Sequence, residues 1–252
     1  MKRLVAICLA GVIATVIYGF FTRSTSEISL LGGLAFAASE MPSMFMVGLT
    51  IKNGGAADVL LGVTSPKAQM VTLVNPKHSD AKMIVPGNST GILAMDGAHV
   101  MLRASELKEG GFIPLTLTFE TAGQVSTRVM HAGLAQMSHK VSDGILISPL
   151  PQVDISLSGQ PGPEGTTLRL AVENFTFYRG AEDARHVSGQ GHAHLYLNGL
   201  KLGRLYAPDF QIGGLPPGHY VLEVVLNAND HRAYLDENGR PVAAQMMLEV
   251  TG

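Results

Sequence analysis

Short segments of alternating apolar and polar residues recur along the chain from residue 45 onward. Alternation with a period of two is typical of a β-strand with one buried face. Asn-Gly, Pro-Gly and Gly-Gly pairs between the segments are typical of turns. The apolar positions include Val47, Leu49 and Ile51; Ile113, Leu115 and Leu117; Leu168, Leu170 and Val172; Ala193, Leu195 and Leu197; and Tyr220, Leu222, Val224 and Leu226. No amphipathic helical pattern of ten or more residues occurs among them, so the sequence predicts an all-β protein.

The alternation lapses over residues 131–152, where no clear period remains. We interpret this stretch as a linker between two β blocks, residues 39–130 and residues 153–252. Short strands separated by turns favour a sandwich or a small barrel for the first block. About a hundred residues of the same pattern suit an immunoglobulin-like β-sandwich for the second.

Residues 1–38 have a different character. Lys2 and Arg3 precede an apolar run over residues 4–21, which is typical of an export signal. Ala35-Phe36-Ala37 would supply a cleavage site, but the run is also long enough to span a bilayer. A cleaved signal peptide and a retained membrane anchor are therefore both open, and both predict that the rest of the protein lies outside the cytoplasm, in the periplasm.

The composition limits which partners and which metal ligands the protein can have. A net charge of -2 with only 15% charged residues argues against a nucleic-acid partner. The single cysteine, Cys8, lies in the apolar run, so the folded part has no thiol and no disulfide. The chain has 12 Met and 9 His, and thioether and imidazole groups are ligands for copper.

One short motif combines both ligand types. His99 and Met101 are two residues apart on a predicted strand, so their side chains share one face, whereas Val100 and Leu102 would face the core. Such a pair suits Cu(I) well and Mg²⁺ or Ca²⁺ poorly.

The surroundings of this motif resemble the PCu(A)C family of periplasmic copper chaperones, over about residues 40–130. The resemblance lies in Val47–Gly55, Val63–Pro66, His99–Leu102, and Leu107–Gly111 running into Ile113–Phe119. It implies a cupredoxin-like Greek-key barrel that binds Cu(I) and passes it toward cytochrome c oxidase assembly, with an assembly protein as partner.

The same resemblance implies a ligand set of a His, a following Met and a later His-x-Met. His99 and Met101 match the later pair, and Met83 matches the first Met. The first His should follow Val71-Thr72-Leu73, but Val74 stands there; His78, four residues on, is the candidate substitute.

A second cluster of candidate ligands lies in the C-terminal block. His192 and His194 share one face of a predicted strand, and His231 follows the end of a later strand. Two imidazoles at i and i+2 with a third more distant are common in copper and zinc sites, and imidazoles accept Cu(I) and Cu(II). The segments around these histidines resemble, more weakly, a small extracytoplasmic β-domain found with copper-handling domains. The alternative is that each histidine is only solvated or hydrogen-bonded.

The sequence has no H-E-x-x-H, Walker A or strand-to-helix G-x-G-x-x-G pattern. We therefore expect a copper-binding chaperone or buffer and not an enzyme. The alternatives are a non-metal extracytoplasmic adaptor and, less favoured, a zinc-dependent hydrolase, which would need three imidazoles and a general base in a cleft. Membrane contact is expected only through the N-terminal segment.

Overall fold

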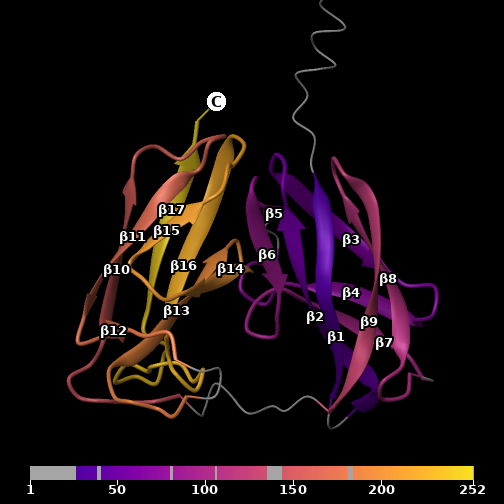
Figure 1. Cartoon of the computed structure of the whole chain (residues 1–252), viewed down its shortest axis with the longest axis horizontal. Helices are drawn as coiled ribbons and strands as arrows, with labels where there is room; N and C mark the ends of the chain where they lie inside the picture. The colour runs from indigo at the N-terminus through magenta and orange to yellow at the C-terminus, as the bar shows by residue number, and fades with distance from the viewer. Residues whose placement is uncertain are drawn as a thin grey trace, which may run out of the picture.

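The structure is a computed structural model that describes residues 27–38, 41–79, 82–105, 107–134, 144–180 and 184–251. Within these ranges every regular element is a β-strand, which confirms the all-β prediction. The strands form two bodies that lie side by side (Figure 1). In the described ranges there is no helix of the length and apolarity that a membrane crossing requires. The apolar run over residues 4–21 lies outside the described residues.

The N-terminal domain is built from the first nine labelled strands. They are β1 (Ile28–Ala38), β2 (Met41–Asn53), β3 (Asp58–Thr64), β4 (Met70–Val74), β5 (Met83–Val85), β6 (Ser89–Leu93), β7 (His99–Arg103), β8 (Phe112–Phe119) and β9 (Gly123–Leu134). The long strand β2 pairs with β1 along one edge, and along the other with β7 and then β6. Strand β1 pairs in parallel with β9, and β9-β8-β3-β5 continue the sheet. Strand β2 thus links β1 and β9 on one side to β6 and β7 on the other, and the strands enclose one apolar core.

Strand β1 corrects the predicted segment boundary. The sequence predicts that residues 28–38 belong to the signal or anchor segment, yet they pair with both β2 and β9. Ala35 and Ala37, the small residues of the expected cleavage site, are 0% and 4% exposed in the N-terminal core. Small residues fit both a cleavage site and a crowded core, so the sequence alone did not show that these residues belong to the first domain. Strand β9 likewise runs to Leu134, into the segment interpreted as a linker.

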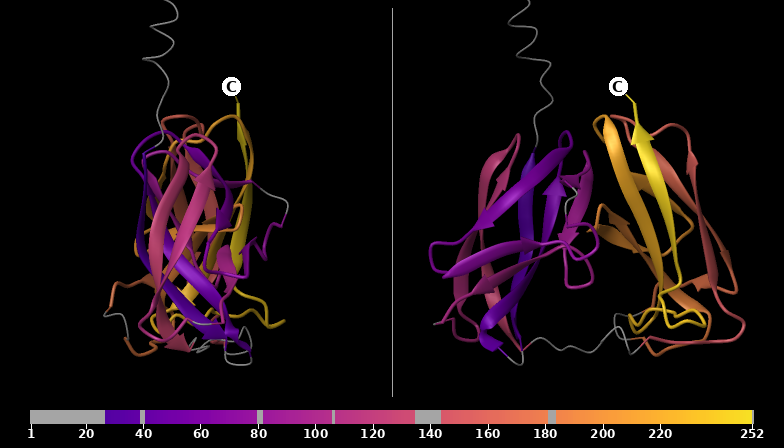
Figure 2. Two further views of the ribbon diagram at one scale, coloured as in Figure 1. Left: turned by 90° about the vertical axis from the view of Figure 1, so that its right-hand side faces the viewer. Right: turned by 180° about the vertical axis from the view of Figure 1, so that it is seen from behind.

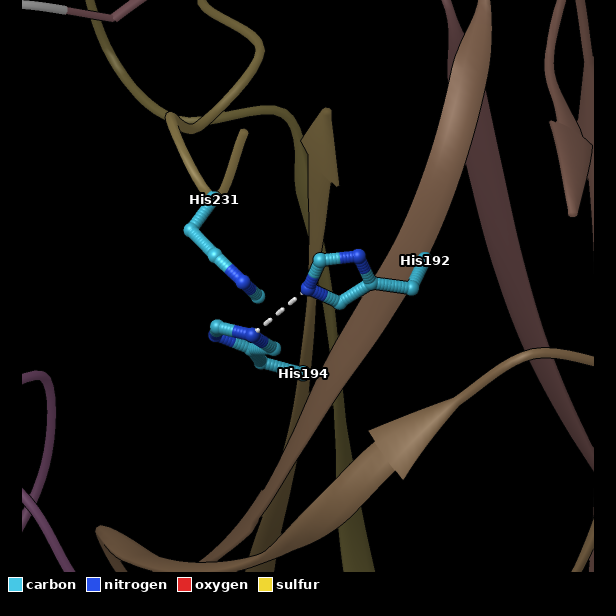
Figure 3. Close-up of side chains that lie close together, drawn as sticks. All are labelled: His192, His194 and His231. Atoms are coloured by element: carbon cyan, nitrogen blue, oxygen red, sulfur yellow. Dashed lines mark hydrogen bonds between the residues drawn. The ribbon is translucent and has the colours of Figure 1, made fainter. Parts of the chain in front are cut away.

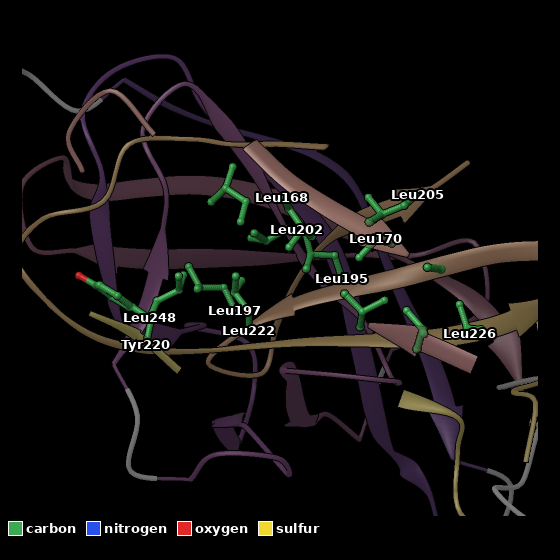
Figure 4. Packing of buried hydrophobic residues seen from close by; sticks show 14 of the residues in the cluster. Leu168, Leu170, Leu195, Leu197, Leu202, Leu205, Tyr220, Leu222, Leu226 and Leu248 are labelled. Carbon is green, nitrogen blue, oxygen red and sulfur yellow. The ribbon is translucent and has the colours of Figure 1, made fainter. Parts of the chain in front are cut away.

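The C-terminal domain is a sandwich of two sheets. Its strands are β10 (Gln152–Ser158), β11 (Thr166–Glu173), β12 (Thr176–Phe177), β13 (Gln190–Leu197), β14 (Leu200–Leu205), β15 (Asp209–Ile212), β16 (Gly218–Ala228) and β17 (Ala243–Val250). The sheet β10-β11-β15 packs against the strands β17-β16-β13-β14. Leucines from the two sheets interlock between them, among them Leu168, Leu195 and Leu222 (Figure 4). This is the two-sheet architecture that the sequence predicted.

The two domains are joined by backbone hydrogen bonds as well as by the chain. Strand β14 pairs with β6 at Lys201 and Ile92, so a sheet runs from one domain into the other (Figure 2). Nearby, the Ala98 N–H donates to the Gly199 carbonyl at 2.9 Å, and the Asn75 side chain donates to the Asn198 carbonyl at 2.7 Å. The face of β13 that points away from its own core is therefore covered in part by the N-terminal domain.

Candidate metal centre

Strand β13 positions two imidazoles on one face. Ala193, Leu195 and Leu197 are fully buried in the C-terminal core. His192 and His194 alternate with them, so they project from the opposite face, as the sequence predicted. Their exposure is only 2% and 5%, because the loop after β16 and the N-terminal domain cover that face.

The third imidazole comes from the loop that follows β16. His231 has a φ of 68°, in the left-handed region that non-glycine residues seldom adopt. Its N–H donates to the Ala228 carbonyl at 3.0 Å, and its carbonyl accepts from the Asn227 side chain at 2.9 Å. This tight turn brings His231 back over β13, with its ring centroid 4.9 Å from that of His192.

The three rings point toward one another (Figure 3). We call His192, His194 and His231 the histidine triad; each offers one nitrogen, and these nitrogens all lie within 4.8 Å of one another. The Nε2 atoms of His192 and His194 are 3.0 Å apart. Two nitrogens on one tetrahedral ion, each about 2.0 Å from it, would be roughly 3.3 Å apart. The geometry therefore fits a shared metal ion after a small movement.

The surroundings keep the imidazoles of His192 and His194 neutral. Burial, with the neighbouring His194, lowers the pKa of His192 to about 3. Burial also lowers the pKa of His194 to about 4, although hydrogen bonding to Asp96 opposes the shift. A metal binds the neutral imidazole through its lone pair, so His192 and His194 need no deprotonation to bind a metal at neutral pH.

A carboxylate from the other domain fixes the orientation of His194. Asp96, in the turn between β6 and β7, lies 2.9 Å from His194 Nδ1 and 2.7 Å from Lys201 Nζ. The Tyr196 hydroxyl donates to the same carboxylate at 2.9 Å. Burial alone would raise the pKa of Asp96, but His194 and Lys201 hold it well below its usual range. With Nδ1–H donating to Asp96, the Nε2 lone pair of His194 faces the centre of the triad.

One side of the triad opens onto a cavity of about 270 Å³. Two of the histidines, His192 and His231, line it together with Arg179, Arg204, Tyr206 and Asn229. Among its described lining residues there is no carboxylate. A metal on the triad would thus have a coordination position free on this side for a further ligand, and the described lining of the cavity supplies no acidic group as a general base.

In the N-terminal domain, His99 and Met101 project from one face of β7, as predicted. Val100 and Leu102, on the other face, are fully buried in the core. His99 is less accessible than expected: it is 9% exposed, and its Nδ1 donates to the Gly97 carbonyl at 2.9 Å.

One of the remaining candidates, Met83, does not face this pair. Met83 is 6% exposed and packs within the N-terminal core, which lies on the other face of β7. The prediction that it joins His99 is therefore wrong, because a thioether in strand β5 serves here as a core side chain. His78 lies in the connection after β4, where its N–H donates to the Asn75 side chain at 3.2 Å. Counting His, Cys, Asp and Glu donors of the described residues, the group that could hold a metal is the histidine triad.

The register of β4 and β7 shows where the first histidine of the implied ligand set would lie. Val74 lies directly opposite His99 in the antiparallel pair of β4 and β7, so the two side chains share one face. A histidine at position 74 would sit beside His99, whereas valine offers no donor atom. The N-terminal site keeps half of the ligand set that the resemblance implies.

The sequence did not predict three groups that lie around the triad: Asp96, Lys201 and Tyr196. Tyr196 continues the His192-Ala193-His194 alternation, which was the available signal. Nothing in the sequence links Asp96 to a histidine some hundred residues away. Asp230, just before His231, forms an ion pair with Arg232 at 2.6 Å and also accepts the Arg232 backbone N–H at 3.3 Å, so it stabilises the turn.

The fold and the site together define a two-domain β-protein with a buried three-histidine centre next to the domain interface. Residues 28–130 match the sequence model of the LpqE-like family, described as "Putative lipoprotein LpqE-like". The match starts at the first residue of β1 and ends in β9, which confirms the resemblance in the N-terminal domain and extends it to include β1.

Three solved structures similar to this chain are PCuAC domains. The apo PmoF2 PCuAC domain is 24% identical, covers 45% of this chain and 97% of its own, and has a TM-score of 0.37. The apo PCuAC domain from PmoF1 is 22% identical over 43% of this chain and 96% of its own, with a TM-score of 0.38. The copper-bound PCuAC domain from PmoF2 is 24% identical over 43% and 95%, also with a TM-score of 0.38. No curated protein matches the chain.

Proposed function

We propose that this protein is an exported, periplasmic copper-binding protein whose principal metal centre is the histidine triad. The observation that carries the proposal is the convergence of three imidazoles, two of them buried and neutral (His192 and His194), whose nitrogens lie within 4.8 Å of one another. If the histidines had been too far apart to share an ion, the metal interpretation of this domain would have failed.

Copper is the metal that this donor set favours. Imidazole nitrogen binds Cu²⁺ more tightly than the other divalent first-row metals, and three imidazoles also suit Cu(I). The match of the N-terminal domain to the LpqE-like family, and its likeness to PCuAC domains, one of them copper-bound, support the same metal. We infer that the triad holds copper for delivery or buffering, as Cu(I) in transfer, and that cytochrome c oxidase assembly is the destination.

His99 and Met101 form a secondary, weaker copper site in this proposal. A thioether and an imidazole on one strand face make half of a Cu(I) site, and Val74 removes the ligand that would strengthen it. The difference between the two sites is one of number: the triad offers three donors and β7 offers two.

Two alternatives are less well supported. A non-metal adaptor would not require three imidazoles facing one point, two of which are buried at a cost in free energy unless they are satisfied. A zinc-dependent hydrolase has its three imidazoles here, but the described lining of the adjoining cavity supplies no carboxylate as general base.

The test is a competitive copper titration of the full chain, purified in mild detergent because of residues 4–21. Cu(I) is titrated under anaerobic conditions and Cu(II) in air, each against a chromophoric chelator. We expect one tightly bound equivalent, and His194→Gln should weaken it by at least about a hundredfold, since one of three ligands is lost.

His99→Ala combined with Met101→Ala is the contrasting variant. It should remove only a weaker second equivalent, because those side chains lie outside the triad. His219→Ala is the matched control, since His219 is exposed at the start of β16. Equal copper affinity in wild type and His194→Gln would overturn the proposal.

A further inference from the structure

The cavity beside the histidine triad contains a polar group that the described protein residues do not satisfy. Asn229 is 6% exposed and lines the cavity. Neither its amide nitrogen nor its amide oxygen has a hydrogen-bond partner among the described residues. A buried amide without partners is unfavourable, and such groups in native proteins call for an explanation. Because both atoms lack partners, the complementary ligand would bring both an acceptor and a donor.

The rest of the lining is cationic and aromatic. Arg204 lies opposite His194 in the pairing of β13 and β14, so it projects from the face that carries the triad. Arg179 lies over the ring of Tyr206, 4.8 Å from its centroid, and Tyr206 in turn lies 5.4 Å from His192. Two guanidinium groups next to a metal site favour an anion, and their planar fork matches a carboxylate.

We propose that the cavity binds a small carboxylate that carries a neighbouring hydroxyl or amino group, as a second ligand of the copper held by the triad. This inference rests on the proposed copper function. One carboxylate oxygen takes the coordination position that faces the cavity, and the arginines hold the charge. The hydroxyl or amino hydrogen is donated to the Asn229 amide oxygen, and the Asn229 amide nitrogen donates to the ligand. Copper would then be held as a ternary complex of protein, metal and small chelator.

Glycolate and acetate are the matched probes, because they differ by a single hydroxyl group. The full chain is loaded with one equivalent of Cu(II), and each anion is titrated while the visible ligand-field absorption and the electron paramagnetic resonance spectrum are recorded. We expect both anions to perturb the spectra, and glycolate to bind about tenfold more tightly than acetate.

Asn229→Leu should abolish the preference for glycolate, because it removes the amide group that bonds to the hydroxyl. Arg179→Gln, at an exposed position that should tolerate replacement, should weaken both anions by a similar factor. Failure to bind copper would overturn the proposed function and this inference together. Copper binding with no spectral response to glycolate, or with equal affinity for both anions in wild type, would overturn this inference alone.

Discussion

Asp96 offers the sharpest test of the site, because it comes from the N-terminal domain yet orients a histidine of the C-terminal domain. In Asp96→Ala, His194 loses the carboxylate acceptor of its Nδ1–H, now 2.9 Å away, and with it the contact that fixes which nitrogen carries the proton. Loss of such an outer hydrogen-bond partner typically reduces metal affinity by about 10–100-fold, or about 1.4–2.7 kcal/mol. We expect a reduction in that range for copper at the triad.

The same change also affects stability. The side chain of Lys201 is 6% exposed, and without Asp96 its ammonium group loses an oxygen at 2.7 Å. Removing one partner of a fully buried pair costs about 3–5 kcal/mol, but the Asp96 side chain is 40% exposed, so water replaces part of the interaction and about 1–3 kcal/mol is expected. Adding Lys201→Met should recover most of the stability without recovering copper affinity.

The assays are chelator competition for copper affinity and urea unfolding for stability. Glu223→Ala is the matched control, because Glu223 forms another ion pair between the domains, with Lys77 at 2.8 Å, that does not touch the triad. It should leave copper affinity unchanged. The reasoning fails if Asp96→Ala binds copper as tightly as wild type, or if Glu223→Ala weakens binding equally.

Three further predictions concern other parts of the molecule. Burial lowers the pKa of His192 from 6.5 to about 3 and that of His194 from 6.5 to about 4, so the metal-free protein takes up protons when it unfolds. Its free energy of unfolding should therefore fall as pH drops from about 6.5 toward 4, by up to about 2.7 kcal/mol per pH unit. Urea titrations of a variant with Gln at both positions should show a shallower fall. Val74→His should strengthen Cu(I) binding in the N-terminal domain by at least about tenfold, and competition titration should show no gain when His99→Ala is also present. Deleting residues 1–37 removes most of β1 and should abolish the cooperative unfolding of the N-terminal domain, as followed by circular dichroism. Deleting residues 1–26 should preserve it. Equal behaviour of the two deletions would contradict the role of β1.

The sequence predicted, for a physical reason, that His192 and His194 share one face of a strand. Alternation buries Ala193, Leu195 and Leu197, so it requires His192 and His194 to share the other face. Because His231 follows the next long strand, its side chain could be expected near His192 and His194. The left-handed backbone conformation that brings it there could not be predicted, because histidine seldom adopts it.

What the sequence missed depends on contacts between distant segments. Asp96 reaches the triad only because β6 of one domain pairs with β14 of the other. Strand β1 was hidden because its small, apolar residues also fit a cleavage site. Met83 has the residue type that the family resemblance implies, and only its packing in the core shows that it does not face His99. Local patterns thus predict faces of strands, whereas tertiary contacts decide which faces meet.

The most direct measurement is a crystal structure of the copper-loaded full chain with anomalous diffraction data at the copper edge. We predict one strong anomalous peak between His192, His194 and His231, about 2.0 Å from a nitrogen of each ring. A peak beside His99 and Met101 with none at the triad would contradict the account, as would the lack of any peak within bonding distance of the three imidazoles.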